Sequence, residues 1–371
     1  MFNSLFKARA VIPFINCGSI TKPDRSFDLD KALAKGIALR NKYRQNLINF
    51  QRNTGCLPQG WQIKQAVRYA EQLVYRGNEW TGYISIRTPP QQFLINIDMP
   101  LSSCVSPACS GKLKYKACLS LSSIKQPGSF SIKYADCSRV SGSIFKDTVA
   151  FGGVKVTEQC FLAVTAMSAE FTGSLVEGIL GLGFPLLSNL HAEPFIQSAY
   201  AQGAIPRNKF SLCLGSAHST NSELFLGGTN STLYKDPIHF NAHVILAGFD
   251  TIIDSGTTII YGPPTAVEKF YSTVPGAQRL GIPGTKLFYC VLSNSIPDVL
   301  FSWGGKSFAI TKENFSLGTV EPGYTIGVIT ADLDISVRGN LWLLGNRLVF
   351  LQNVYTVFSF ECNAIGFANL A

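Results

Sequence analysis

The chain has 371 residues, of which 46% are apolar and 15% are charged, and this composition supports one large or two medium cores and excludes a disordered protein. The net charge of +9 is uneven, because residues 1–80 hold 13 Lys and Arg against 5 Asp and Glu, whereas residues 81–371 hold 19 against 18. This asymmetry indicates a basic arm or prosegment. Since no basic stripe with interleaved aromatics follows it, we predict no nucleic-acid partner.

Two helices are predicted in the basic N-terminal region. In residues 26–50, apolar side chains recur every three or four positions after Ser26, which can cap the helix. Residues 62–75 show the same spacing and are followed by Gly77. Both segments carry Lys and Arg on the opposite face, so residues 1–78 are interpreted as a basic prosegment that lies across an acidic cleft. A solvated amphipathic surface segment is the alternative.

After the basic region, short runs of Val, Ile, Phe and Tyr alternate with turns, in a chain with 33 Gly and 18 Pro, which predicts an all-β structure. Residues 80–87 and 93–98 are predicted strands of a hairpin that ends on Asp98. Residues 251–254 form a second apolar strand that ends on an acid, Asp254. The two loops lie 156 positions apart, and their similarity indicates an internal duplication.

The run from Asp254 to Thr258 contains what a catalytic carboxylate needs. Two carboxylates that share one proton can hydrolyse a peptide bond: the ionised group draws a proton from water, and the protonated group polarises the scissile carbonyl. Gly256 offers a backbone N–H with conformational freedom, and the hydroxyls of Thr257 and Thr258 can tie the two loops together. We therefore predict that Asp98 and Asp254 form a catalytic pair that uses no metal ion and no cofactor.

This loop resembles the second active-site loop of the pepsin-like aspartic endopeptidases, and the resemblance covers nearly everything after residue 80. Residues 83–91 resemble the strand and turn before the first catalytic Asp of that family, with Arg87 in place of Gly. Residues 132–142 resemble its flap, which makes Tyr134 the flap tyrosine. Further similar segments follow in family order, at residues 177–183, 223–228, 296–299, 342–346 and 355–358.

The resemblance, which is to fungal-type members, implies an all-β, two-lobed acid protease fold with a short helical prosegment. An N-terminal lobe at residues 79–235 would carry Asp98 and the flap, and a C-terminal lobe at residues 236–371 would carry Asp254. The chain would be a zymogen and a monomer that acts on extended protein or peptide substrates at acid pH. Because no segment is apolar and long enough to span a membrane, we also expect no membrane partner. The implied substrate-binding residues are Tyr134, Gly256, Thr257 and Thr258.

The first active-site loop departs from the family pattern. The run Asp-Met-Pro-Leu-Ser that begins at Asp98 stands where the family has Asp-Thr-Gly-Ser/Thr-Ser. Met99 lacks a hydroxyl, Pro100 lacks a backbone N–H, and Leu101 cannot hydrogen-bond the acid. The segment up to Cys104 is also several residues short of a tryptophan-bearing strand that braces the flap. Losing one such donor costs about a hundredfold to a thousandfold in rate, so we expect weakened or lost activity.

Ten cysteines indicate an oxidising, secretory setting. Cys104 and Cys109 lack the paired CxxC or nearby His of a zinc site, and they resemble the small disulfide loop of the family. Asn230 and Asn314 begin glycosylation sequons. The longest apolar run near the N-terminus, residues 10–16, contains a proline and is too short for a secretory leader, and nothing spans a membrane. On balance we expect a secreted or vacuolar glycoprotein with a disulfide bond.

Three interpretations stay open. The chain is an active endopeptidase, a silent homologue that acts as a protein-binding or inhibitor module, or a sequence in which skipped coding segments shorten the first loop. Simpler interpretations of single residues also stand, because a lone strand-ending acid such as Asp98 commonly caps a turn, and Tyr134 can be a packed hairpin aromatic.

Overall fold

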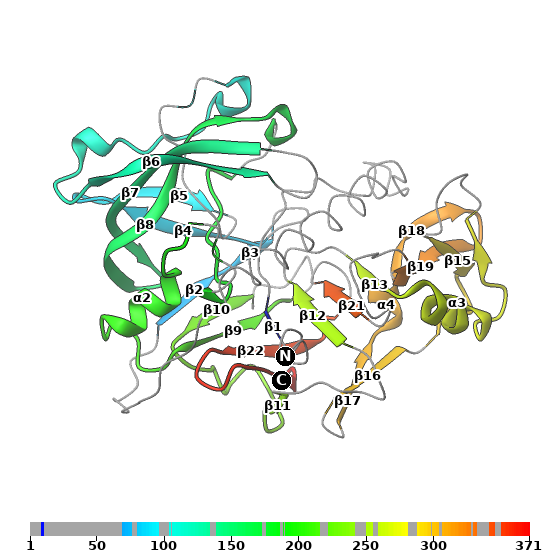
Figure 1. Cartoon of the computed structure of the whole chain (residues 1–371). Helices are drawn as coiled ribbons and strands as arrows, with labels where there is room; N and C mark the ends of the chain where they lie inside the picture. The colour runs from blue at the N-terminus through cyan, green and yellow to red at the C-terminus, as the bar shows by residue number, and fades with distance from the viewer. Residues whose placement is uncertain are drawn as a thin grey trace, which may run out of the picture.

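The computed structural model of the chain is mostly β-structure arranged in two lobes (Figure 1). This arrangement confirms the all-β, two-lobed prediction. The structure describes residues 9–10, 69–75, 80–95, 104, 106–133, 139–172, 176–185, 188, 190–215, 222–241, 250–254, 259–280, 288–297, 299–303, 306–327, 329–331, 341–345 and 350–371.

The N-terminal lobe, at the left of Figure 1, is built around one antiparallel sheet of order β3-β4-β7-β6, with β5 paired to β4 and β8 paired to β7. Its strands are β3 (Val74–Tyr75), β4 (Trp80–Ile86), β5 (Gln91–Ile95), β6 (Ile124–Lys133), β7 (Arg139–Phe151) and β8 (Val154–Met167). The 3₁₀ turns η2 (Pro107–Cys109) and η3 (Ala117–Leu119) lie between β5 and β6, and η4 (Ala169–Phe171) and α2 (Phe195–Ala201) follow β8.

The C-terminal lobe, at the right of Figure 1, contains two sheets and a hairpin. The first sheet has the order β1 (Arg9–Ala10), β12 (Asp250–Asp254), β21 (Leu341–Gly345), β13 (Ile260–Gly262) and β20 (Ile329–Ala331). The second sheet has the order β14 (Gln278–Arg279), β15 (Tyr289–Leu292), β19 (Tyr324–Gly327) and β18 (Ser316–Glu321). The hairpin and helices are β16 (Val299–Trp303), β17 (Lys306–Ile310), α3 (Pro264–Ser272) and α4 (Lys312–Phe315).

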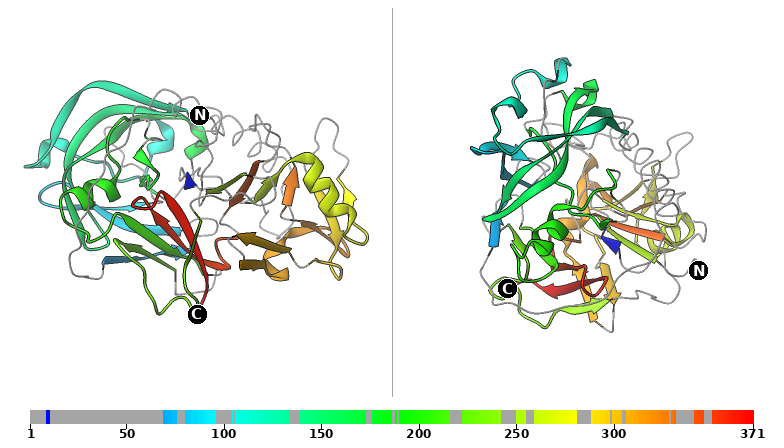
Figure 2. Two further views of the ribbon diagram at one scale, coloured as in Figure 1. Left: turned by 60° about the horizontal axis from the view of Figure 1, so that its bottom comes forward. Right: turned by 60° about the vertical axis from the view of Figure 1, so that its left-hand side comes forward.

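A third sheet joins the two halves of the sequence. Its order is β11 (His239–Asn241), β23 (Ala364–Asn369), β22 (Val354–Ser359), β9 (Lys209–Cys213), β10 (Glu223–Leu226) and β2 (Tyr69–Gln72). The junction is the antiparallel pair β22–β9, in which Thr356 lies opposite Leu212. Figure 2 shows the red C-terminal strands beside the green strands of the first half from two further directions. The last strands of the chain therefore share one sheet with β9, β10 and β2.

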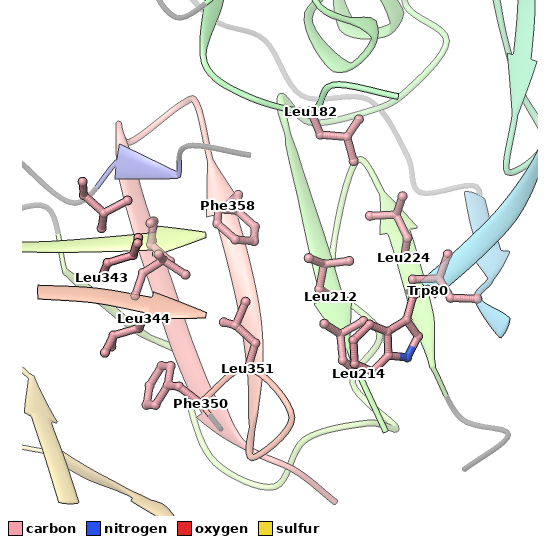
Figure 3. Packing of buried hydrophobic residues seen from close by; sticks show 14 of the residues in the cluster. Trp80, Leu182, Leu212, Leu214, Leu224, Leu343, Leu344, Phe350, Leu351 and Phe358 are labelled. Atoms are coloured by element: carbon pink, nitrogen blue, oxygen red, sulfur yellow. The ribbon is translucent and has the colours of Figure 1, made fainter. Parts of the chain in front are cut away.

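Among the described residues, the largest of three buried apolar clusters extends through both lobes. Figure 3 shows this packing on either side of the shared sheet. The side chains labelled there are Trp80, Leu182, Leu212, Leu214, Leu224, Leu343, Leu344, Phe350, Leu351 and Phe358. Fully burying one such side chain contributes about 1.5–3 kcal/mol to the free energy of folding.

The helix predicted at residues 62–75 is wrong over residues 69–75, where the chain forms β2 and β3. β2 pairs with β10, so that Tyr69 lies opposite Leu226, and β3 pairs with β4. Hydrogen bonding to two sheets and burial of Leu73 stabilise the strands. A short helix here would gain less, because helix nucleation is unfavourable in isolation. The rest of this segment and the helix predicted at residues 26–50 lie outside the described residues.

Arg87, at the turn after β4, adopts φ 80°, a region that glycine enters without cost. Its Nε is buried without a hydrogen-bond partner, and its Nη1 donates to the carbonyl of Leu119 over 3.4 Å. We expect Arg87→Gly to raise the free energy of unfolding by about 0.5–1 kcal/mol, because relief of left-handed strain exceeds the added entropy of the unfolded chain. Urea unfolding measures the change. Arg87→Ala removes the same side chain but keeps the strain, so equal stability of the two variants would contradict this explanation.

An ion pair fixes the start of β9 to the turn after β22. Arg207 donates to both carboxylate oxygens of Glu361, with Nη2 to Oε2 at 2.6 Å and Nε to Oε1 at 2.8 Å, and the backbone N–H of Asn208 also donates to Oε1, over 2.9 Å. Burial raises the pKa of Glu361, but the hydrogen bonds and charge of Arg207 outweigh it, so the pKa lies below its ordinary 4.5. The carboxylate therefore stabilises the fold fully above about pH 4.5, and this contribution is lost as the pH falls through the folded pKa.

We expect Glu361→Gln to lower the free energy of unfolding at pH 7 by about 1.5 kcal/mol, because charged hydrogen bonds are lost, and to differ less from the parent at pH 3. Thermal melts at both pH values measure this. The control is Glu158→Gln, which removes an exposed pair with Lys146 at 3.7 Å and is expected to change little. A Glu361→Gln effect that persists undiminished at pH 3 would contradict the role of the carboxylate charge.

Candidate active site

Asp254 is the last residue of β12, as the sequence predicts for a strand that delivers an acid to a loop. β12 runs parallel to β21, and Asp254 lies opposite Gly345 in the register. Neighbouring Ile253 and Leu344 are 3% and 0% exposed. Burial of this kind is typical of parallel strands covered on both faces, and it fixes the end of β12 that bears the acid.

The strand before Asp98 has a matching parallel partner. Ile95, the last residue of β5, forms a parallel bridge with Gly178. Adding the 156-residue spacing of the two acids to Ile95 gives Thr251, which lies opposite Trp342 on β21. Gly178 and Trp342 begin the similar runs Gly-Ile-Leu-Gly and Trp-Leu-Leu-Gly. The two lobes therefore pair equivalent positions, which is what an internal duplication produces.

Glu177 hydrogen-bonds the end of β5, a few residues before Asp98. Its carboxylate accepts the backbone N–H of Leu94 at 2.8 Å and that of Leu113 at 3.3 Å, and its own N–H donates to the carbonyl of Leu94 at 2.8 Å. Lys112 adds a hydrogen bond from Nζ to the carbonyl of Val176 at 2.7 Å. This positioning role was missed by sequence reasoning, although Glu177 opens one of the runs that resemble the family.

The predicted flap is an antiparallel hairpin of β6 and β7, in which Lys133 lies opposite Arg139. Tyr134 follows Lys133 directly, in the connection between the two strands. Tyr134 itself lies outside the described residues. So do Asp98 and the loop residues Gly256, Thr257 and Thr258, and of Asp254 the structure describes only the backbone.

The predicted disulfide between Cys104 and Cys109 is present and closes a short loop after the segment that begins at Asp98. The Nζ of Lys114 donates to the carbonyl of Cys104 at 2.7 Å and holds the start of this loop. Cys290 is a free, buried thiol, and burial raises its pKa. The disulfide therefore anchors the far end of the segment that begins at Asp98.

A buried polar network supports the hairpin of β4 and β5. Asp147 is fully buried and accepts the hydroxyls of Tyr115 and Ser122, each at 2.6 Å. Ser122 Oγ also lies 2.8 Å from the hydroxyl of Thr88 in the hairpin turn. Burial, together with the hydrogen bond to Asp147, raises the pKa of Tyr115. The network fixes the turn from which β5 runs toward the first acid.

One of the two sequons is engaged inside the fold. Asn230 is 7% exposed, and its Nδ2, the atom that would carry a glycan, donates to Glu223 at 2.9 Å. Its backbone N–H donates to the hydroxyl of Tyr355 at 2.7 Å, and burial raises the pKa of Tyr355 to about 12. A glycan at Asn230 conflicts with this packing, whereas Asn314 is partly exposed.

The described residues contain no group of three or more His, Cys, Asp or Glu side chains placed to hold a metal ion. Among their helices, none combines the length and apolar character needed to cross a membrane.

Comparison with known proteins identifies the family. The model of the eukaryotic aspartyl protease family matches residues 79–245 and 238–370. The chain belongs to this family. An aspartic protease of Phaffia rhodozyma is 35% identical over 335 residues, which cover 81% of this chain and 78% of the Phaffia protein. Cathepsin D of Rattus norvegicus is 30% identical over 338 residues (80% and 82%), and pepsin A of Rhinolophus ferrumequinum is 28% identical over 325 residues (80% and 82%). The predicted resemblance is thus confirmed.

Proposed function

We propose that the chain is an aspartic-type endopeptidase that cleaves extended protein or peptide substrates at acid pH. The observation that carries this proposal is the matched pairing of the two acid-bearing strands, Ile95 with Gly178 and Thr251 with Trp342, in a chain of the aspartyl protease family. Relatives named aspartic protease, cathepsin D and pepsin A support it.

Asp98 and Asp254 are proposed as the dyad. Continuing the parallel register from Ile95 would set Asp98 opposite Gly181, as Asp254 is set opposite Gly345. Two carboxylates brought together in this way cannot both ionise, so one remains protonated at acid pH.

The dyad then works as a paired acid and base. The ionised carboxylate accepts a proton from the water between the two acids, and the water oxygen attacks the scissile carbonyl carbon. The protonated carboxylate donates to the carbonyl oxygen, and a proton then passes to the leaving amine as the C–N bond breaks. No metal ion or cofactor enters these steps. Tyr134 would cover the substrate from the flap, and Gly256, Thr257 and Thr258 would hydrogen-bond the acid and the substrate backbone.

The basic N-terminal region is proposed as a prosegment at residues 1–78, before lobes at 79–235 and 236–371. Supporting this, Arg9 and Ala10 form β1, which pairs in parallel with Ile252 and Ile253 of the strand that ends on Asp254. A zymogen of this kind would be a secreted or vacuolar monomer. Acid would release the segment by neutralising the carboxylates that its Lys and Arg face.

The test is proteolysis of denatured globin by recombinant full-length protein after exposure to acid. We expect cleavage that is blocked by a statine-type peptide inhibitor of aspartic proteases. Cleavage that resists this inhibitor but yields to a serine- or metallo-protease inhibitor would come from a contaminant and count against the proposal.

A second candidate is a binding-only relative that recognises proteins without cleaving them. It is favoured by Met99, Pro100 and Leu101, which replace the hydroxyls and the backbone N–H that support the first acid. Binding of the statine-type inhibitor without turnover, measured by calorimetry on the acid-treated protein, distinguishes this candidate from the endopeptidase.

A further inference from the structure

Three large aliphatic side chains protrude from one short stretch of the N-terminal lobe. Leu119, Leu121 and Ile124 are 53%, 87% and 47% exposed. They lie between the end of η3 and the first residue of β6, in the blue-green turns at the outer end of the lobe in Figure 1. Single exposed apolar residues are ordinary, but three within six positions make a patch that needs an explanation. We call residues 119–124 the aliphatic patch.

The patch is held in its exposed position by the chain beneath it. The backbone N–H of Leu121 donates to the carbonyl of Thr88 at 2.8 Å, and that of Leu119 donates to Lys116 at 3.0 Å. Ser122, between the apolar residues, donates to the buried carboxylate of Asp147 at 2.6 Å. Because the polar residues of the stretch face inward and are bonded there, its aliphatic residues point to solvent.

Exposed lysines flank the aliphatic patch in the sequence. Lys116 and Lys125 flank it and are both exposed. Residues 104–135 hold five Lys and no Asp or Glu. Nearby, Lys146 lies opposite Ile124 in the sheet, and it is paired with Glu158 at 3.7 Å. The partner that complements this surface is therefore anionic as well as apolar.

We propose that the aliphatic patch docks peripherally on an anionic lipid surface. Leu119, Leu121 and Ile124 would enter the boundary between headgroups and acyl chains, while Lys116 and Lys125 contact lipid phosphates, as basic amphipathic surfaces do. A protein partner fits less well, since protein interfaces cover about 800 Å² per partner and favour aromatic and Arg anchors. The expectation of no membrane partner came from the lack of a spanning segment, which a peripheral contact does not require.

The experiment is co-sedimentation of full-length protein with two kinds of vesicle. One is phosphatidylcholine alone, and the other contains about 30% phosphatidylserine, which gives the vesicle a negative surface potential. We expect binding only to the anionic vesicles, and weakening by salt. Leu119→Ser with Leu121→Ser should lower the partition coefficient about a hundredfold. Lys116→Glu with Lys125→Glu should lower it by a similar factor, about a hundredfold.

Matched controls lie far from the patch. Leu300→Ser removes a leucine that is 63% exposed on β16, and Lys235→Glu reverses an exposed lysine near β11, so neither should change partitioning. Thermal melts confirm that each variant is folded. Equal binding to both vesicle types, or equal losses in the control variants, would overturn the proposal. A dimer that Leu119→Ser with Leu121→Ser dissociates, with no vesicle binding by the parent, would overturn it in favour of a second copy of the chain.

Discussion

Asp254→Asn is expected to reduce the turnover of denatured globin at acid pH by about a thousandfold or more. An amide cannot accept the proton of the attacking water or share a proton with Asp98, so the acid–base pathway loses one of its two groups. The substitution changes neither side-chain volume nor the buried strand β12, in which Ile252 and Ile253 carry the packing. Initial rates with parent and variant at equal concentration measure the effect.

The matched control for this prediction is Asp250→Asn, which makes the same chemical change at the other end of the same strand. Asp250 lies opposite Leu341, at the end of β12 remote from the loop. We expect the control to retain parental turnover and both variants to bind the statine-type inhibitor. If Asp254→Asn retained full activity while inhibitor still blocked it, Asp254 would not be part of the dyad.

Much of this architecture is predictable from the sequence because local pattern and long-range packing agree. The strand that ends on Asp254 has the apolar pair Ile252 and Ile253 at its centre, and these residues are buried where the strand lies between β1 and β21. The disulfide between Cys104 and Cys109 lies where the family resemblance predicts it, and the segment that resembles the flap begins in β6 and ends in β7, which pair as a hairpin. The strand register around Ile95 and Gly178 agrees with the repeat inferred from two similar loops.

Other features depend on contacts that a linear pattern cannot reveal. Residues 69–75 have helical spacing, yet two sheets recruit them because unpaired strand edges gain more from backbone pairing than a short helix does. Asn230 has the sequence of a glycosylation site, but Glu223 and Tyr355 bury it. Leu121 is of a residue type that is usually buried, but it is exposed because the neighbouring Ser122 turns inward and hydrogen-bonds Asp147. In each case the structure depends on a contact with residues that the local repeat of apolar and polar positions does not identify.

The sequence departs most from the family pattern in the residues that follow Asp98. Glu177 holds the chain before this segment, and the disulfide between Cys104 and Cys109 holds the chain after it. Apart from its shorter length, what the segment lacks is local: a hydroxyl at Met99 and a backbone N–H at Pro100. We therefore predict that substitution within the loop repairs this local part of the defect.

Replacing Met99, Pro100 and Leu101 by Thr, Gly and Ser is expected to raise turnover of denatured globin by about a hundredfold or more, because two or three donors to the carboxylate are restored. Initial rates at acid pH compare the repaired protein with its parent. The control carries the same triple change together with Asp254→Asn and should show no gain, since the donors act only through an intact dyad. A folded repaired protein that binds the statine-type inhibitor but turns over no faster than its parent would show that the shortened stretch before Cys104, and the flap support it removes, limits the rate instead.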